Sequence, residues 1–202
     1  MKRNSLLLLI IVVLIGVGVA AALSILHDGL SARAKPTALE AMLAHKARHL
    51  AIPADARTMT NPIPDNAQNM EDAEMHFADH CATCHGNNGG GDTMYGKGLY
   101  PKPPDLRLPQ TQELSDGEIF WIIENGVRFT GMPGFGGDDD SKQDSWKLVR
   151  LIRHFPKLSM DEQMMMEKNN PKSPDDMEEE KQENDFLNGA PAPKESEAHH
   201  HH

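Results

Sequence analysis

Apolar residues form one unbroken run near the N-terminus and recur with helical period further along the chain. The run covers residues 5–26, which are uncharged and dominated by Leu, Ile, Val and Ala, and it follows Lys2 and Arg3. A helix of its 22 residues spans about 30 Å, the thickness of the hydrocarbon core of a bilayer. We therefore predict a membrane anchor within residues 1–30, with the basic N-terminus on the cytoplasmic side.

A cleaved secretory signal peptide is the alternative interpretation of this run. Such peptides carry an apolar region of roughly 7–15 residues followed by a small-x-small cleavage site. The run is longer than that, although Ala32-Arg33-Ala34 provides a weak cleavage site. The length favours an uncleaved anchor that contacts the lipid bilayer through residues 5–26.

Beyond the anchor, apolar residues three and four positions apart predict helices at about 37–50, 69–80, 115–125 and 142–155. Thr37 with Glu40, and Ser115 with Glu118, have the spacing of capping boxes at two helix starts. The first helix is amphipathic, and it is either a spacer or a contact for lipid or a partner. Residues 51–65 contain three prolines and few large apolar groups, which predicts an extended linker.

The remaining segments predict loops and a tail. Five glycines make residues 87–98 too flexible for a helix or strand, and prolines stiffen residues 100–106. From residue 159 onward the chain is acidic and Met-rich without a sustained apolar period, which predicts disorder. The final run, His199–His202, is either an expression tag or a native metal-binding end.

The chain therefore divides into four predicted parts. They are the anchor (1–30), a juxtamembrane helix with a Pro-rich linker (31–65), one packed all-α domain (66–158) and the acidic tail (159–202). Residues 1–65, 66–158 and 159–202 carry net charges of +3, −5 and −8 within a total of −10. An acidic domain and tail disfavour nucleic acid as a partner and favour cationic protein surfaces.

Cys81-Ala82-Thr83-Cys84-His85 carries the chemistry of the predicted domain. C-x-x-C-H is the attachment site of c-type haem, and it uses both cysteines of the chain. Each thiol adds to one haem vinyl group, and the histidine that follows supplies an axial ligand to the iron. We therefore predict one covalent haem c bound by Cys81, Cys84 and His85.

Three other interpretations of this motif are weaker. A structural zinc site needs four ligands, and the chain has no second cysteine pair. A thioredoxin-like motif begins a helix in a βαβ unit, whereas this motif closes a helical segment. A structural disulfide rarely closes a loop with two intervening residues.

The second axial ligand decides between an electron carrier and a haem that binds exogenous ligands. Met132 is the leading candidate, because it lies in a Gly- and Pro-bounded loop between two amphipathic helices. Met94 follows His85 closely and would need a tight loop around the haem edge. The remaining candidates lie on the predicted helices and are less suitable: His76, His80 and His154.

The order of these motifs resembles the class I cytochrome c family. The resemblance rests on Cys81–His85, the loop Pro104-Asp105-Leu106, the helix from Leu114 to Gly126 and the loop Gly131-Met132-Pro133, and it covers about residues 66–158. It implies an all-α fold of three to four helices around one haem. The first and last helices of the domain then cross, which brings Phe77 against Leu148, Leu151 and Ile152.

The resemblance also implies roles for individual residues. Met132 matches the distal iron ligand, and Pro104 and Leu106 line the cofactor, with the carbonyl of Pro104 accepting the second N–H of His85. Asp138 to Asp140 are expected to lengthen the connection that precedes the last helix. His/Met ligation raises the reduction potential relative to bis-His ligation.

These observations predict a function without enzymatic activity of its own. We expect a membrane-anchored monohaem cytochrome that carries single electrons between membrane-bound redox partners of a respiratory or dehydrogenase type. The haem domain is expected on the periplasmic side of a bacterial cytoplasmic membrane. The alternative is a gas-binding sensor or a peroxidase-like protein with an open sixth coordination site.

Overall fold

The computed structural model describes residues 2–28, 31–172 and 174–187, and these form helices and loops without a strand. The histidine run His199–His202 lies outside the described residues. The all-α fold class is confirmed. In chain order the helices are α1 (Lys2–Asp28), α2 (Ala38–Ala51), η1 (Ala56–Thr58), α3 (Ala67–His80), α4 (Ala82–His85), α5 (Met94–Lys97), α6 (Pro109–Gln112), α7 (Asp116–Asn125), α8 (Asp139–His154), η2 (Phe155–Lys157), α9 (Met160–Lys168) and α10 (Pro174–Leu187).

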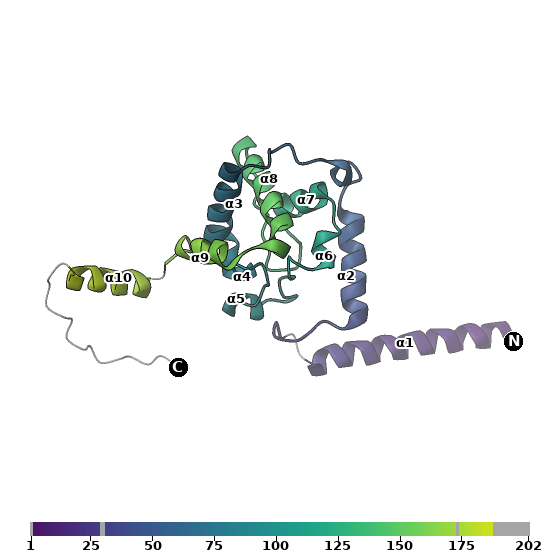
Figure 1. The fold of residues 1–202 in the computed structure, drawn as a ribbon. Coiled ribbons are helices and arrows are strands. Elements are labelled where there is room, and N and C mark those ends of the chain that lie inside the picture. The colour runs from purple at the N-terminus through teal and green to yellow at the C-terminus, as the bar shows by residue number, and fades with distance from the viewer. Residues whose placement is uncertain (1, 29–30, 173, 188–202) are drawn as a thin grey trace.

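Helix α1 contains the predicted anchor. Its segment Asn4–Ser24 has a mean hydropathy of 3.2, and none of it is buried against the rest of the chain. By length and composition it is the one described helix that could cross a membrane. Figure 1 shows α1 extending away from the other helices, which is consistent with a single-pass membrane protein.

Helices α3 and α8 lie side by side at the centre of the folded domain (Figure 1). One buried cluster joins Ala73 and Phe77 of α3 to the apolar stripe of α8, formed by Leu148, Leu151 and Ile152. Phe77 also meets Phe155 edge to face, with ring centroids 4.9 Å apart. The helix pairing implied by the family resemblance is therefore present.

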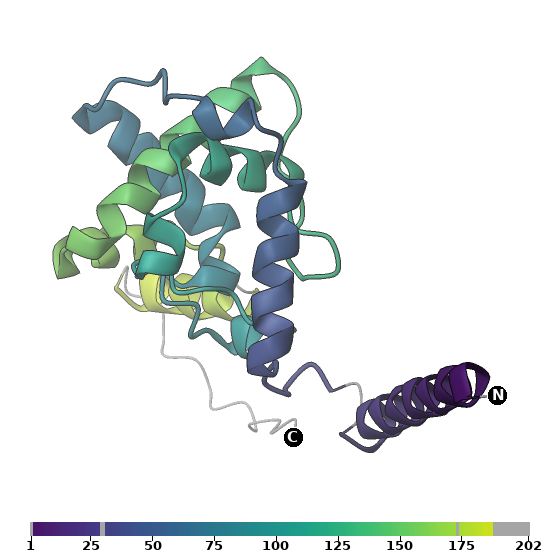
Figure 2. The ribbon, with the colours of Figure 1, turned by 90° about the vertical axis from the view of Figure 1, so that its right-hand side faces the viewer.

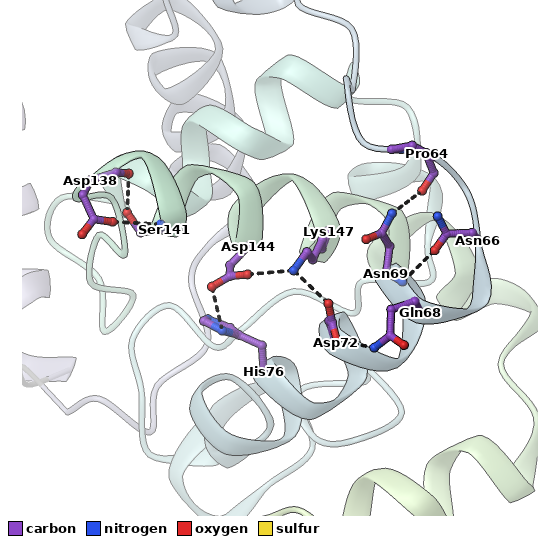
Figure 3. A network of polar contacts seen from close by, with 10 residues as sticks. All are labelled: Pro64, Asn66, Gln68, Asn69, Asp72, His76, Asp138, Ser141, Asp144 and Lys147. Carbon is purple, nitrogen blue, oxygen red and sulfur yellow. Dashed lines mark hydrogen bonds and ion pairs between the residues drawn. The ribbon is translucent and has the colours of Figure 1, made fainter.

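Polar contacts connect the outer edges of the same two helices (Figure 3). Lys147 Nζ of α8 donates to Asp72 Oδ2 of α3 at 2.9 Å and to Asp144 Oδ1 at 3.3 Å. The hydrogen bond from Lys147 lowers the pKa of the Asp72 carboxyl. These partly buried pairs orient α3 against α8, while the buried apolar cluster supplies most of the stabilisation.

The N-terminus of α8 differs from the expected one. Asp138 is its N-cap and accepts a 3.0 Å hydrogen bond from Ser141 N, and Asp139 and Asp140 occupy the first turn. Acidic side chains are favourable there because they interact with the positive end of the helix dipole. The acidic run therefore begins the last helix of the domain, and the expectation that it lengthens the preceding connection was wrong.

Residues 51–65 do not form the expected extended linker. The side chains of Ile52 and Ala56 are 1% and 4% exposed, and η1 packs against α7. Further along, Asn61 Nδ2 donates to Trp146 O at 2.9 Å, and Arg150 of α8 donates to Ile63 O. Residues 51–65 therefore lie on the surface of the domain and do not extend through solvent.

The tail is helical where it was expected to be disordered. Ser159 and Glu162 form a capping box that starts α9, and Met166 on this helix is fully buried in the core cluster. His154 of α8 adds a 2.9 Å contact to Glu162 Oε1. The folded part of the chain therefore extends past residue 158, because one long apolar side chain and a helix cap are enough to dock α9 on α3. Helix α10 follows it.

We expect Met166→Ala to lower the free energy of unfolding by about 2–5 kcal/mol, because it leaves a cavity in a fully buried position. The neighbouring Met165 is 52% exposed, and Met165→Ala is expected to stay within about 0.5 kcal/mol of the parent. Guanidinium denaturation of the haem-loaded protein measures both values. Equal effects of the two substitutions would show that α9 is not docked through Met166.

Candidate haem site

The C-x-x-C-H motif forms a tight turn at the end of α3. Cys81 is the C-cap of α3 and donates its N–H to Phe77 O at 2.8 Å. The short helix α4 then brings the backbone N–H of Cys84 and of His85 to Cys81 O, at 3.1 and 2.9 Å. Gly86 ends the turn with a φ of 71°, a backbone conformation that favours glycine. The turn therefore projects all three functional side chains from a single helical end.

Both cysteines are free thiols, so the disulfide interpretation does not hold in this structure. Burial raises the pKa of the Cys81 thiol to about 12, and the neighbouring Cys84 adds to the shift. Cys81 also packs against the buried core cluster. Within the part of the chain that the structure describes, no group of three or more His, Cys, Asp or Glu residues is placed to hold a metal ion.

His85 is held in the form that binds iron. Burial lowers the pKa of its imidazole to about 4, so the ring is neutral at physiological pH. Its Nδ1 atom is buried without a hydrogen-bond partner. The ring of Phe77 lies beside it, with centroids 6.4 Å apart. A neutral, shielded imidazole next to two free thiols is the donor set that haem c requires.

The glycine-rich segment after the motif contains a helix, which the sequence interpretation missed. Thr93 caps α5 by accepting from Gly96 N, and its hydroxyl also donates to Thr83 O at 2.8 Å. A Cβ on Gly96 would lie 2.6 Å from Cys84 O, and Gly91 N donates to His85 O at 2.7 Å. The segment therefore folds back onto the C-x-x-C-H turn and fixes its backbone.

The proline loop packs against this segment. Leu106 is 7% exposed, belongs to the core cluster and donates its N–H to Gly89 O at 2.8 Å. Gln112 Nε2 donates to Leu106 O at 2.7 Å and to Ile152 O at 2.8 Å, which ties the loop to α8. The expected hydrogen bond from His85 to the carbonyl of Pro104 is not formed, since Nδ1 of His85 has no partner.

Asp105 stabilises the proline loop through Arg107. The Arg107 side chain donates to the Asp105 carboxylate from Nε at 2.8 Å and from Nη2 at 2.6 Å. These hydrogen bonds lower the pKa of the Asp105 carboxyl. A depressed pKa contributes stability above the unfolded value of 3.8, and this contribution is lost as the pH falls through the folded pKa.

We expect Asp105→Asn to lower the free energy of unfolding by about 1 kcal/mol at pH 7, because solvent screens the partly exposed Arg107. The difference from the parent should shrink as the pH falls below the ordinary pKa of aspartate. Denaturation curves at pH 7 and in acid test this expectation. A difference that stays constant over that range would exclude the ion pair as its cause.

The Met132 loop is held at the edge of the same core. Met132 is partly buried and packs against the core cluster, as Cys81 does. Val127 N donates to Met132 O at 3.1 Å, and a Cβ on Gly126 would lie 2.5 Å from Gly134 N. The side chain of Leu99 contacts Gly131, where a Cβ would lie only 2.6 Å from it. Gly126 therefore allows the Met132 loop to pack closely on the end of α7, and Gly131 allows it to pack against Leu99.

The other candidate ligands lie in different environments. Met94 is 78% exposed on α5. His76 and His80 face each other on α3 with ring centroids 4.8 Å apart, and His76 Nδ1 is 3.8 Å from Asp144 Oδ2 (Figure 3). His154 contacts Glu162 of α9. Of the candidates that the sequence raised, Met132 is the one that packs against the core cluster, as Cys81 of the motif also does.

The fold, the C-x-x-C-H turn and the neutral imidazole define a c-type cytochrome domain that binds haem and transfers electrons. Residues 68–152 match the family model described as cytochrome C oxidase, cbb3-type, subunit III. The match runs from α3 to α8 and leaves out α1, α2, α9 and α10. No curated protein matches the chain.

Proposed function

We propose that this protein is a membrane-anchored monohaem c-type cytochrome that passes single electrons between redox partners in or at the same membrane. The observation that carries the proposal is the C-x-x-C-H turn at the end of α3, whose Cys81 packs on the same apolar core as the Met132 loop. The chain has one C-x-x-C-H motif, so we assign it one covalent haem. Cys81 and Cys84 hold this haem, and His85 and Met132 ligate its iron.

The residues around the C-x-x-C-H motif restrict the chemistry that the proposed haem site can perform. Haem held by these residues supplies an iron that changes between the ferric and ferrous states. Phe77 and Leu106 belong to the core cluster, and Cys81 and Met132 pack against it, so the motif borders apolar groups. The hydrogen bonds of Thr93 and Gly91 keep the backbone of the motif in place. A haem bound by thioethers and two axial ligands in this way suits an electron carrier, and we assign no catalytic residues.

The proposed membrane side of the haem domain and the proposed kind of redox partner follow from the distribution of charge along the chain. Lys2 and Arg3 precede the apolar helix, and the positive-inside rule then puts the haem domain on the periplasmic side of a bacterial cytoplasmic membrane. The segment 66–158 carries a net charge of −5, which favours donors and acceptors with cationic docking surfaces. The family match fits a subunit of an oxidase complex as well as a separate carrier.

The optical spectrum of the ferrous protein with and without carbon monoxide tests the proposal. If both His85 and Met132 bind iron, the spectrum stays unchanged, because no coordination site is open. Prompt binding of carbon monoxide would overturn the electron-carrier assignment in favour of a gas sensor or a peroxidase-like protein. Met94→Ala is the matched control, since this exposed methionine is not expected to alter either spectrum.

A further inference from the structure

Helix α2 has two faces with different surroundings. Its inner face contacts the haem domain through polar groups: Tyr100 Oη donates to Glu40, Gln110 Nε2 contacts His45, and His49 Nδ1 lies 3.2 Å from Glu118 Oε1. Its opposite face is largely apolar, with Lys46 among its leucines, and it is exposed. Leu39, Leu43 and Leu50 on that face are 62%, 55% and 79% exposed.

The two faces lie on opposite sides of the helix. At about 100° per residue, Leu39, Leu43 and Leu50 fall within roughly 40° of one another, and His45 and Arg48 fall on the far side. Ala41 and Arg48, on the inner face, are the half-buried residues of α2. Leu39, Leu43 and Ala47 line a shallow hollow on the apolar face. An amphipathic helix normally turns its apolar side to the core, and α2 turns it away from the core.

The chain just after α2 is attached to the haem domain. Arg57 Nη2 donates to Ile52 O at 3.0 Å, just after the end of α2. Ala56 of η1 fits against Gly117 of α7 so closely that a Cβ on Gly117 would lie 1.8 Å from Ala56 O. Because the chain directly after α2 packs in this way, the C-terminal end of α2 is held against the haem domain.

The position of α2, directly after the membrane anchor, indicates that lipid covers its apolar face. Nine residues, 29–37, separate the end of α1 from the start of α2, so the first turn of α2 lies within about 30 Å of the membrane surface. Both views show α1 leaving the molecule on the flank that α2 occupies (Figures 1 and 2). Arg33, Lys35 and Lys46 give this segment a positive charge, which attracts anionic lipid headgroups.

We propose that α2 lies in the headgroup region of the bilayer, with Leu39, Leu43 and Leu50 inserted among the lipids, and that it thereby fixes the orientation of the haem domain on the membrane. The inference rests on the proposed membrane anchoring and adds a second lipid contact to it. The apolar stripe supplies the insertion, and the neighbouring basic residues supply attraction to anionic lipids.

Spin labels on single cysteines test this inference in the full-length, haem-loaded protein, since haem occupies Cys81 and Cys84. The protein is placed in vesicles that contain anionic lipid, and collisions with oxygen are compared with collisions with a water-soluble nickel chelate. Labels at Leu43→Cys and Leu50→Cys report on the apolar face of α2. The label at Met160→Cys reports on α9, which lies across the domain from α2 (Figure 1), and the label at Val12→Cys reports on α1.

We expect the oxygen-to-nickel collision ratio at positions 43 and 50 to rise well above that at position 160 and to stay below that at position 12. Ratios at 43 and 50 equal to that at 160, with position 12 shielded, would overturn the inference and leave the anchoring intact. Exposure of position 12 to water would overturn the anchoring as well. Magnetic broadening between labels at position 43 would indicate a second copy of the chain on this face in place of lipid.

A charge variant provides a matched control. With a label at Leu39→Cys, the pair Leu43→Glu and Leu50→Glu is expected to lower the collision ratio to the value at position 160. The pair Met164→Glu and Met165→Glu makes the same charge change at half-exposed positions of α9 and should leave it unchanged. A ratio at position 39 that is insensitive to the α2 pair would also overturn the inference.

Discussion

Replacing both Cys81 and Cys84 by alanine is expected to abolish covalent haem attachment completely. Each sulfur forms one thioether bond, and the chain contains no other cysteine that could replace either of them. Haem staining after denaturing electrophoresis and extraction with acidified acetone measure the loss. We expect no stained band and full extraction of any haem that remains bound through His85.

A single-cysteine variant and a substitution at the neighbouring Thr83 show whether the loss of haem is specific to the two cysteines. Cys84→Ala alone should keep a stained band, because the Cys81 thioether remains. Thr83→Ala changes an exposed side chain between the two cysteines, and its backbone carbonyl still accepts from Thr93. It should therefore retain haem at the level of the parent. Haem that withstands extraction in the double variant would show that covalent attachment does not use this motif.

Met132→Ala is expected to lower the reduction potential and to open the iron to carbon monoxide. Axial ligands set haem potentials over a range of about 0.8 V, and a thioether favours ferrous iron, so its loss should shift the potential downward by an appreciable part of that range. Potentiometric titration and the optical spectrum with carbon monoxide measure the two effects. Both should occur while the haem stays attached through the cysteines.

The Met132→His variant shows whether the effects of Met132→Ala come from loss of an iron ligand or from loss of side-chain packing. Histidine restores a sixth ligand, so this variant should again exclude carbon monoxide while its potential remains low. Met70→Ala is a useful comparison, because Met70 is another partly buried methionine that packs on the core cluster. It should change stability and leave the potential near that of the parent. Carbon monoxide binding in the parent and in Met132→Ala alike would show that Met132 is not a ligand.

The parts of the fold that were predictable depend on local pattern. The capping boxes at Thr37 and Ser115 begin α2 and α7 as the spacing indicates. The apolar stripe of α8 faces α3 because three and four residue spacing places Leu148, Leu151 and Ile152 together. The C-x-x-C-H motif is equally local, since five consecutive residues contain its donor set. Such features need no knowledge of distant parts of the chain.

The parts that were wrong depend on contacts between distant segments. Ala56 is buried because Gly117, sixty residues later in the numbering, leaves room for its carbonyl. A small side chain and a distant glycine do not produce a periodic pattern, so residues 51–65 resembled a free linker. Helix α9 similarly depends on Met166 alone for its buried contact. In the site, Thr93 and Gly96 were missed because their role is to pack under the backbone of the motif.

The docking of residues 52–63 onto the domain restricts where electrons can be exchanged. Had residues 51–65 been extended, they would have let the haem travel about 50 Å further from the bilayer. With that segment packed, residues 29–37 are the remaining connection between α1 and the folded unit, and they reach about 30 Å. With the anchor in a bilayer, the shorter connection confines the haem to a thin layer next to that bilayer and raises its encounter rate with centres in that layer. Donors and acceptors whose redox centres stand far above the bilayer lie beyond its reach.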